Sequence, residues 1–247
     1  LTKNGSGTWS FEGTNNYFTG IQNINQGTLK IGSANTNFID TVSNPIVIGT
    51  GAVLEMASSN AVTASMAISG AGAILKSGAG TFSLTNQTNA YSGGTTVTNG
   101  ILKAGVAAGG VNAPYFGTGR VTVMSGAALD VQGNSLSNAI TINGTGVNNG
   151  GALTNSTTGT SNATLSGLLT LGSDSTIVNN ASGNSAINLT NFGTITGSGY
   201  ALTLGGSRGG AISSIIGTGS GTIIPACLRT SRIRAIKSLS PIIIAAR

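Results

Sequence analysis

The sequence predicts an all-β fold, a parallel β-solenoid of roughly nine coils, and three observations carry this prediction. Of the 247 residues, 127 are Gly, Thr, Ser or Asn, all of which form helices poorly. Apolar residues still make up 39% and charged residues only 6%, so we expect a folded chain rather than a disordered one. A unit of Gly followed by an apolar residue also recurs along the chain.

The recurring unit is a Gly, once a Ser, followed within three residues by an apolar marker residue. The markers lie about 24 residues apart on average, at Leu29, Leu54, Leu75, Leu102, Leu129, Leu153, Ile177, Leu202 and Ile223. Apolar and polar residues alternate around many markers, which indicates strands with one buried face. We expect two short strands per unit, joined by Gly and Asn turns, and units stacked through residues 1–222. A β-sandwich is the alternative, although its strands would not hold one interval along the whole chain.

Charged residues gather at the position directly after the markers. With Lys3 added from an earlier copy of the same pattern, this row reads Lys3, Lys30, Glu55, Lys76, Lys103, Asp130, Thr154, Val178, Thr203 and Ile224. Because each marker faces inward, we expect its neighbour to face solvent, with Lys30–Glu55, Glu55–Lys76 and Lys103–Asp130 as pairs one coil apart. Such pairs contribute about 0–1 kcal/mol each, so the stripe is expected mainly to fix register. A binding stripe for a charged polymer is the alternative.

The net charge of +6 comes mainly from the end of the chain. Residues 1–222 carry a net charge of +1, whereas residues 223–247 carry +5 and no Gly. We therefore expect no nucleic-acid partner for the body. We divide the chain into a solenoid segment, 1–222, and a basic tail, 223–247, that is out of frame or disordered. The chain opens on Leu1 without a signal peptide, so we expect a fragment of a longer protein.

One stretch resembles a known repeat family. It contains Lys76-x-Gly78-x-Gly80-Thr81, then Asn89-x-Tyr91-x-Gly93-x-Thr95-x-Val97, then Gly100-x-Leu102. A looser copy opens the chain, with Lys3-x-Gly5-x-Gly7-Thr8, then Tyr17, then Gly27-x-Leu29. This pattern is similar to the autotransporter-associated β-strand repeat of Gram-negative passenger domains.

The resemblance implies a right-handed β-helix that is secreted or displayed on the bacterial cell surface. It also implies export through a C-terminal outer-membrane barrel, which is absent from this chain, and a host or glycan ligand whose identity the sequence does not give. The family carries no catalytic residues in this repeat. We expect its aromatic positions, Trp9 with Phe82 and Tyr17 with Tyr91, to pack inside the coils rather than to stack on a ligand.

The sequence gives little support to catalysis. It has no His and a single Cys, Cys227, which excludes His-dependent triads and an internal disulfide. The acids lie far apart, at Glu12, Asp40, Glu55, Asp130 and Asp174. In the predicted row Glu55 and Asp130 stand three coils apart, roughly 14 Å, beyond the usual separation of paired catalytic carboxylates.

We therefore expect no catalytic, cofactor-binding or metal-binding residues. The expected function is a non-catalytic structural rod or adhesin scaffold. The alternative is a β-helix carbohydrate-active enzyme, either a polysaccharide lyase or a hydrolase. If the chain itself binds a ligand, the irregular spans 103–118 and 205–220 are where we expect the binding loops.

Overall fold

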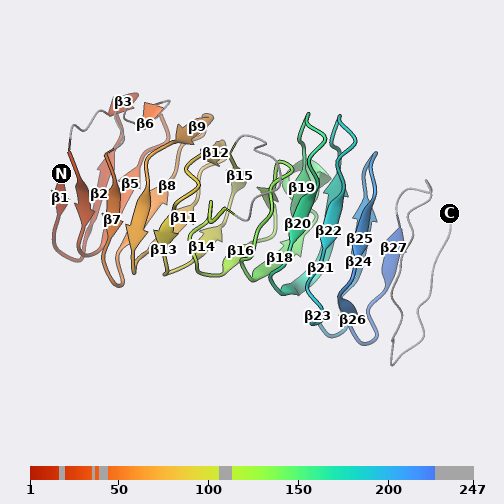
Figure 1. Cartoon of the computed structure of the whole chain (residues 1–247). Coiled ribbons are helices and arrows are strands. Elements are labelled where there is room, and N and C mark those ends of the chain that lie inside the picture. Colours follow the sequence, from red (N-terminus) through yellow and green to blue (C-terminus); the bar gives the residue numbers. More distant parts are fainter. Residues whose placement is uncertain (17–19, 35–36, 39–43, 106–112, 226–247) are drawn as a thin grey trace. The chain divides into compact units, whose positions relative to one another are not determined.

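Parallel β-strands dominate the computed structural model (Figure 1), which describes residues 1–16, 20–34, 37–38, 44–105 and 113–225. The chain divides into two units, the first made of Leu1–Gly105 with Ala113–Val121 and the second running from Thr122 onward. The prediction of an all-β solenoid of parallel strands, with about nine turns, is confirmed. The right-handed sense of the coil stays a prediction.

The first unit consists of coils with three short strands each, and the equivalent strands of successive coils stack on three faces. Ladder A contains β1 (Thr2–Lys3), β4 (Gln22–Ile24), β7 (Ile46–Ile48), β10 (Ile68–Gly70) and β13 (Ala90–Tyr91). Ladder B contains β2 (Thr8–Phe11), β5 (Thr28–Ile31), β8 (Val53–Met56), β11 (Ala73–Lys76) and β14 (Thr95–Val97). The third face carries β3 (Asn15–Asn16), β6 (Asn37–Phe38), β9 (Val62–Ala64), β12 (Thr81–Leu84) and β15 (Gly100–Ala104).

The expectation of two strands per unit was wrong, because each coil of the first unit has three. Several strands, such as β1 and β13, are only two residues long. Two residues are too few to show an alternating pattern, so the sequence does not reveal them.

Inward side chains stack in rows from coil to coil and form the core of the first unit. In ladder B, Leu29 pairs with Leu54 and Leu54 with Ile74, all three fully buried. The next inward row contains Ile31 and Met56. A stack of this kind buries the apolar face that a single coil leaves open.

The second unit repeats this architecture. One ladder contains β18 (Ile140–Gly144), β21 (Leu169–Asn179), β23 (Thr194–Thr196) and β26 (Ile215–Gly217). A second contains β17 (Ala127–Asp130), β19 (Leu153–Asn155), again β21, β24 (Leu202–Gly205) and β27 (Ile223–Pro225). The third contains β20 (Ala163–Leu165), β22 (Ile187–Leu189) and β25 (Gly210–Ile212). Strand β21 serves two ladders because it runs on past an irregularity in its register with β18. Strand β16 (Val121–Val123) spans the boundary between the units.

Asparagines hold the bends of the second unit, as the composition suggested. Asn155 is fully buried, and its amide donates to Asn179 Oδ1 at 3.3 Å and to Ser185 Oγ at 2.9 Å. Asn148 and Asn149 adopt positive φ within the 3-10 turn η1 (Val147–Asn149). Asparagine thus provides both turn geometry and hydrogen bonds along the stack.

The chain beyond Pro225 lies outside the described residues, and with it Cys227 and nearly all of the predicted basic tail. Strand β27 pairs with β24, so the first three residues assigned to the tail continue a coil. The division at residues 222 and 223 itself stays a prediction. In the part of the chain that is described, no helix has the length and apolar character needed to cross a membrane.

Candidate functional site

Two lysines lie in the interior of the first unit, in rows that are otherwise largely apolar. Lys76 is 1% exposed and stands in ladder B between Met56 and Val97. Lys3 is 5% exposed and pairs with Ile24 in ladder A. A buried ammonium is costly unless hydrogen bonds replace its water, so the contacts of these two groups need a full account.

Backbone carbonyls surround both ammonium groups. Lys3 Nζ donates to the carbonyl oxygens of Gly5 at 2.6 Å, Gln26 at 2.9 Å and Asn4 at 3.4 Å. Lys76 Nζ donates to the carbonyl oxygens of Gly78 and Asn99, the latter at 3.1 Å. In each case one acceptor belongs to the turn that follows the lysine, and another lies 23 residues ahead of the lysine, in the next coil.

We call these two arrangements the lysine clamps. The first clamp is Lys3 with Asn4, Gly5 and Gln26, and the second is Lys76 with Gly78 and Asn99. Both tie a turn of one coil to the equivalent turn of the next through a single side chain. The two clamps share the same arrangement, and their lysines lie 73 residues apart in the sequence.

A glycine with positive φ follows the far carbonyl of each clamp. Gly27 has φ of 65° and Gly100 has φ of 67°. A Cβ on Gly100 would lie less than 3.0 Å from backbone atoms of Gly80, Gly78 and Ala79, and a Cβ on Gly27 would meet the preceding coil in the same way. Glycine is therefore required both for the turn and for the close approach of the two coils.

Burial also changes the acidity of the second clamp. Loss of water around the ammonium lowers the pKa of Lys76 from 10.5 to about 8. The neutral form of this lysine is thus accessible in weakly alkaline solution.

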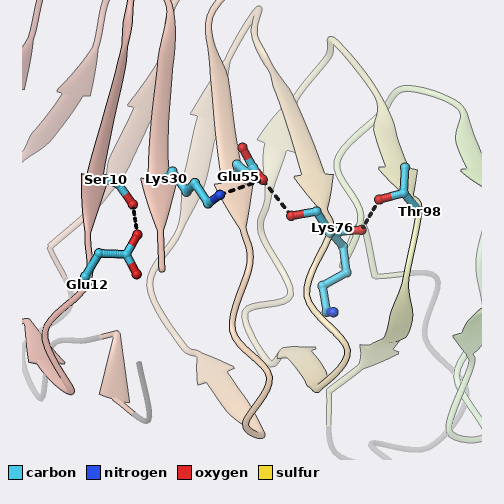
Figure 2. Close-up of polar contacts among 7 residues, drawn as sticks. Ser10, Glu12, Lys30, Glu55, Lys76 and Thr98 are labelled. Atoms are coloured by element: carbon cyan, nitrogen blue, oxygen red, sulfur yellow. Dashed lines mark hydrogen bonds and ion pairs between the residues drawn. The ribbon is translucent and has the colours of Figure 1, made fainter. Parts of the chain in front are cut away.

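The predicted charge row breaks at these lysines. Lys30 does pair with Glu55, and Lys30 Nζ lies 3.8 Å from Glu55 Oε1, so this pair is confirmed. The pair Glu55–Lys76 is wrong, because Glu55 pairs with Leu75 and its carboxylate accepts from Ser77 Oγ at 2.7 Å. Figure 2 shows the Lys76 nitrogen turned away from Glu55.

The remaining members of the row fall on different ladders. Lys3 lies in ladder A, not beside Lys30, and Lys103 pairs with Ser83 rather than with Lys76. In the second unit, the pairs Asp130–Thr154, Thr154–Val178 and Thr203–Ile224 are confirmed, whereas Val178 pairs with Gly205 and not with Thr203. A continuous solvent-facing stripe is therefore wrong. The pair Lys103–Asp130 joins residues of different units and stays a prediction.

Asp130 was expected to face solvent but is buried within the second unit. Its carboxylate accepts hydrogen bonds from the backbone N–H and side-chain amide of Gln132, each at 3.2 Å. It also accepts from Ser156 N at 3.1 Å and Ser156 Oγ at 2.5 Å. Four donors replace its water, so this acid joins two coils of the second unit.

The other described acids also have partners from the chain itself. The carboxylate of Glu12 accepts from Ser10 Oγ (Figure 2), and Asp174 Oδ1 accepts from the backbone N–H of Ala201 at 2.8 Å. Among the described residues, no group of three or more His, Cys, Asp and Glu side chains could hold a metal ion. Asp40 lies outside the described residues.

The aromatic residues of the repeats behave unequally. Phe82 and Tyr91 are fully buried, which confirms the packing role expected for them, and Tyr91 OH lies 2.6 Å from Thr95 Oγ1. The same expectation was wrong for Trp9, which is 68% exposed. Trp9 belongs to the first described coil, which has a neighbouring described coil on one side only. Tyr17 lies outside the described residues.

Of the two spans proposed for binding loops, one contains regular strands and the other is described only in part. Span 205–220 contains strands β25 and β26, so its description as irregular was wrong. Within span 103–118, residues 106–112 lie outside the described part of the chain.

The family model of the passenger-associated-transport-repeat matches residues 1–31 and 74–104. The chain carries two passenger repeats. Each matched segment contains one complete lysine clamp and the glycine that follows it, and the repeats together with the solenoid fit an autotransporter passenger. No curated protein and no solved structure matches the chain.

The sequence does contain a pattern that indicates the clamps, although the prediction of the charge row did not use it. In both passenger repeats a lysine precedes Gly-x-Gly-Thr and stands 24 residues before a second glycine, Gly27 or Gly100. This shared offset marks a contact between coils, which a row of outward charges does not require.

Proposed function

We propose that the chain is a non-catalytic passenger segment that acts as a structural rod or adhesin scaffold, secreted or displayed on the bacterial cell surface. The observation that supports this most strongly is the lysine clamp, found in both passenger repeats. In each, the most conspicuous charged group of the repeat is used to join successive coils. A repeat built for coil stacking suits a protein whose task is extension and presentation.

The carboxylates support the same proposal. Glu55 is engaged by Lys30 and Ser77, and Asp130 accepts four hydrogen bonds. General acid–base chemistry on a polysaccharide needs a carboxyl group held free to exchange a proton with substrate. The proposed partners are a host or glycan surface ligand and an outer-membrane translocator domain.

Surface display tests this proposal directly. The full chain would be expressed between a signal peptide and an outer-membrane translocator domain, with an epitope inserted in the exposed turn at residues 158–160. We expect antibody to label intact cells and added protease to remove the label. An epitope that is exported but stays inaccessible on intact cells would contradict the proposal.

A second readout separates the scaffold from the adhesin and from an enzyme. Displaying cells would be applied to immobilised host matrix and to a glycan array, with and without a grafted peptide ligand in the same turn. A scaffold confers binding only with the graft, and an adhesin confers it without. Release of oligosaccharides from a polysaccharide panel by the purified chain would refute the non-catalytic role.

A further inference from the structure

The two lysine clamps differ in the number of hydrogen-bond acceptors around the lysine nitrogen. Among the described residues, Lys3 Nζ has three carbonyl acceptors and Lys76 Nζ has two. An ammonium has three N–H donors, whereas a neutral amine has two N–H donors and a lone pair. The first clamp therefore fits an ammonium, and the second clamp matches a neutral amine.

No opposite charge faces Lys76 from the strands packed against it. On one side its row partner is Met56 and on the other Val97. Glu55, the charged residue of the neighbouring strand β8, is directed to the other face and bonded to Lys30 and Ser77 (Figure 2). Strands β12 and β14 bring no charged residue.

The Tyr91 phenol is another titratable group buried in the first unit. It is bonded to Thr95, and burial raises its pKa, so it stays neutral. Within the described part of the chain, an ammonium at Lys76 thus has neither a counter-ion nor a full set of acceptors.

We propose that Lys76 is a proton-linked clamp between two coils, whose cage is built for the neutral amine, so that folding of the first unit releases a proton in weakly alkaline solution. This inference does not depend on the proposed function. The amine keeps both hydrogen bonds, to Gly78 and Asn99, and loses the cost of a buried charge.

The sign of the effect on stability follows from the lowered pKa. Between about pH 8 and pH 10.5 the unfolded chain holds a proton on Lys76 that the folded chain has released. Stability therefore rises with pH across this window, by up to about tenfold in the unfolding equilibrium constant per pH unit. Below pH 8 both states are protonated, and the contribution of Lys76 is flat.

A direct test is an NMR titration of the full chain labelled with 13C at lysine Cε. The chain has five lysines, and the Lys76 signal is identified by its loss in Lys76→Met. This substitution introduces the same side chain as the neighbouring Met56 of the row. We expect this signal to titrate with a midpoint near pH 8. A midpoint at or above pH 10 would overturn the proposal.

If Lys76→Met does not fold, elimination through Lys3→Met, Lys30→Met, Lys103→Met and Lys237→Met assigns the same signal in chains that keep the second clamp. Urea unfolding from pH 7 to pH 10.5 provides the second readout. The rise in stability expected for the wild type should persist in the surface control Lys103→Met and vanish in Lys76→Met. A rise of equal size in Lys76→Met would show that other groups cause it and would refute the clamp's role.

Discussion

Replacing Gly100 by Ala should open the contact between two coils at the second clamp. Gly100 has φ of 67°, where a side chain costs about 1–2 kcal/mol. The added methyl would also lie less than 3.0 Å from three backbone atoms of the preceding coil, and overpacking of this kind costs about 1–3 kcal/mol more. Gly51 is the matched control, because its φ is 74° but nothing lies within 4 Å of its Cβ position.

We expect Gly100→Ala to destabilise the coil by about 2–5 kcal/mol and Gly51→Ala by about 1–2 kcal/mol. Native-state hydrogen exchange reports this locally through two amides, Ile101 N, which donates to Gly80 O, and Thr98 N, which donates to Lys76 O. Protection of both amides should fall roughly tenfold or more beyond the effect of Gly51→Ala. Equal protection in the two variants would refute the argument that coil contact, rather than φ alone, requires this glycine.

Two further substitutions test the core of the first unit. Phe82→Ala should cost about 3–4 kcal/mol because it empties a fully buried site, whereas Trp9→Ala at the equivalent position of the first repeat should cost less than about 0.5 kcal/mol. Thermal unfolding of both variants checks this, and similar losses would contradict the unequal burial. Burial raises the pKa of the Tyr91 phenol, so the folded chain keeps a proton that the unfolded chain loses above about pH 10. Stability should therefore fall as pH rises past that point, and Tyr91→Phe should flatten the fall measured by alkaline urea unfolding. An unchanged slope would show that this phenol does not contribute.

The parallel stacking was predictable from sequence because it depends on alternating apolar and polar residues, a pattern that is visible within each single strand. Leu29 and Leu54, for example, were identified as inward residues and pair as expected. The prediction of which residues face inward failed where two apolar residues follow each other in a strand. Ile74 and Leu75 both suit the core, and the prediction chose Leu75 as the inward one, whereas Ile74 is the buried residue.

This single error of one residue reversed the direction of Lys76. In a strand, a shift by one position moves every side chain to the other face. Lys76 was therefore predicted on the surface beside Glu55, although it lies in the core. A charged side chain is usually exposed to solvent. Lys76 can be buried because its ammonium donates to the backbone carbonyls of Gly78 and Asn99, which belong to turns.

The two passenger repeats occupy different positions on the solenoid, which shows that the clamp is not tied to one face. From Lys3 the ladder passes through β4, β7 and β10, three complete coils, before β11 brings Lys76 on the next face. The two passenger repeats therefore stand on different faces of the first unit, yet both build a clamp with an acceptor 23 residues ahead. The clamp depends on the distance along the chain from one coil to the next, not on the face. In this chain, each of the two matched segments thus attaches one coil to the next, whichever face the lysine lies on.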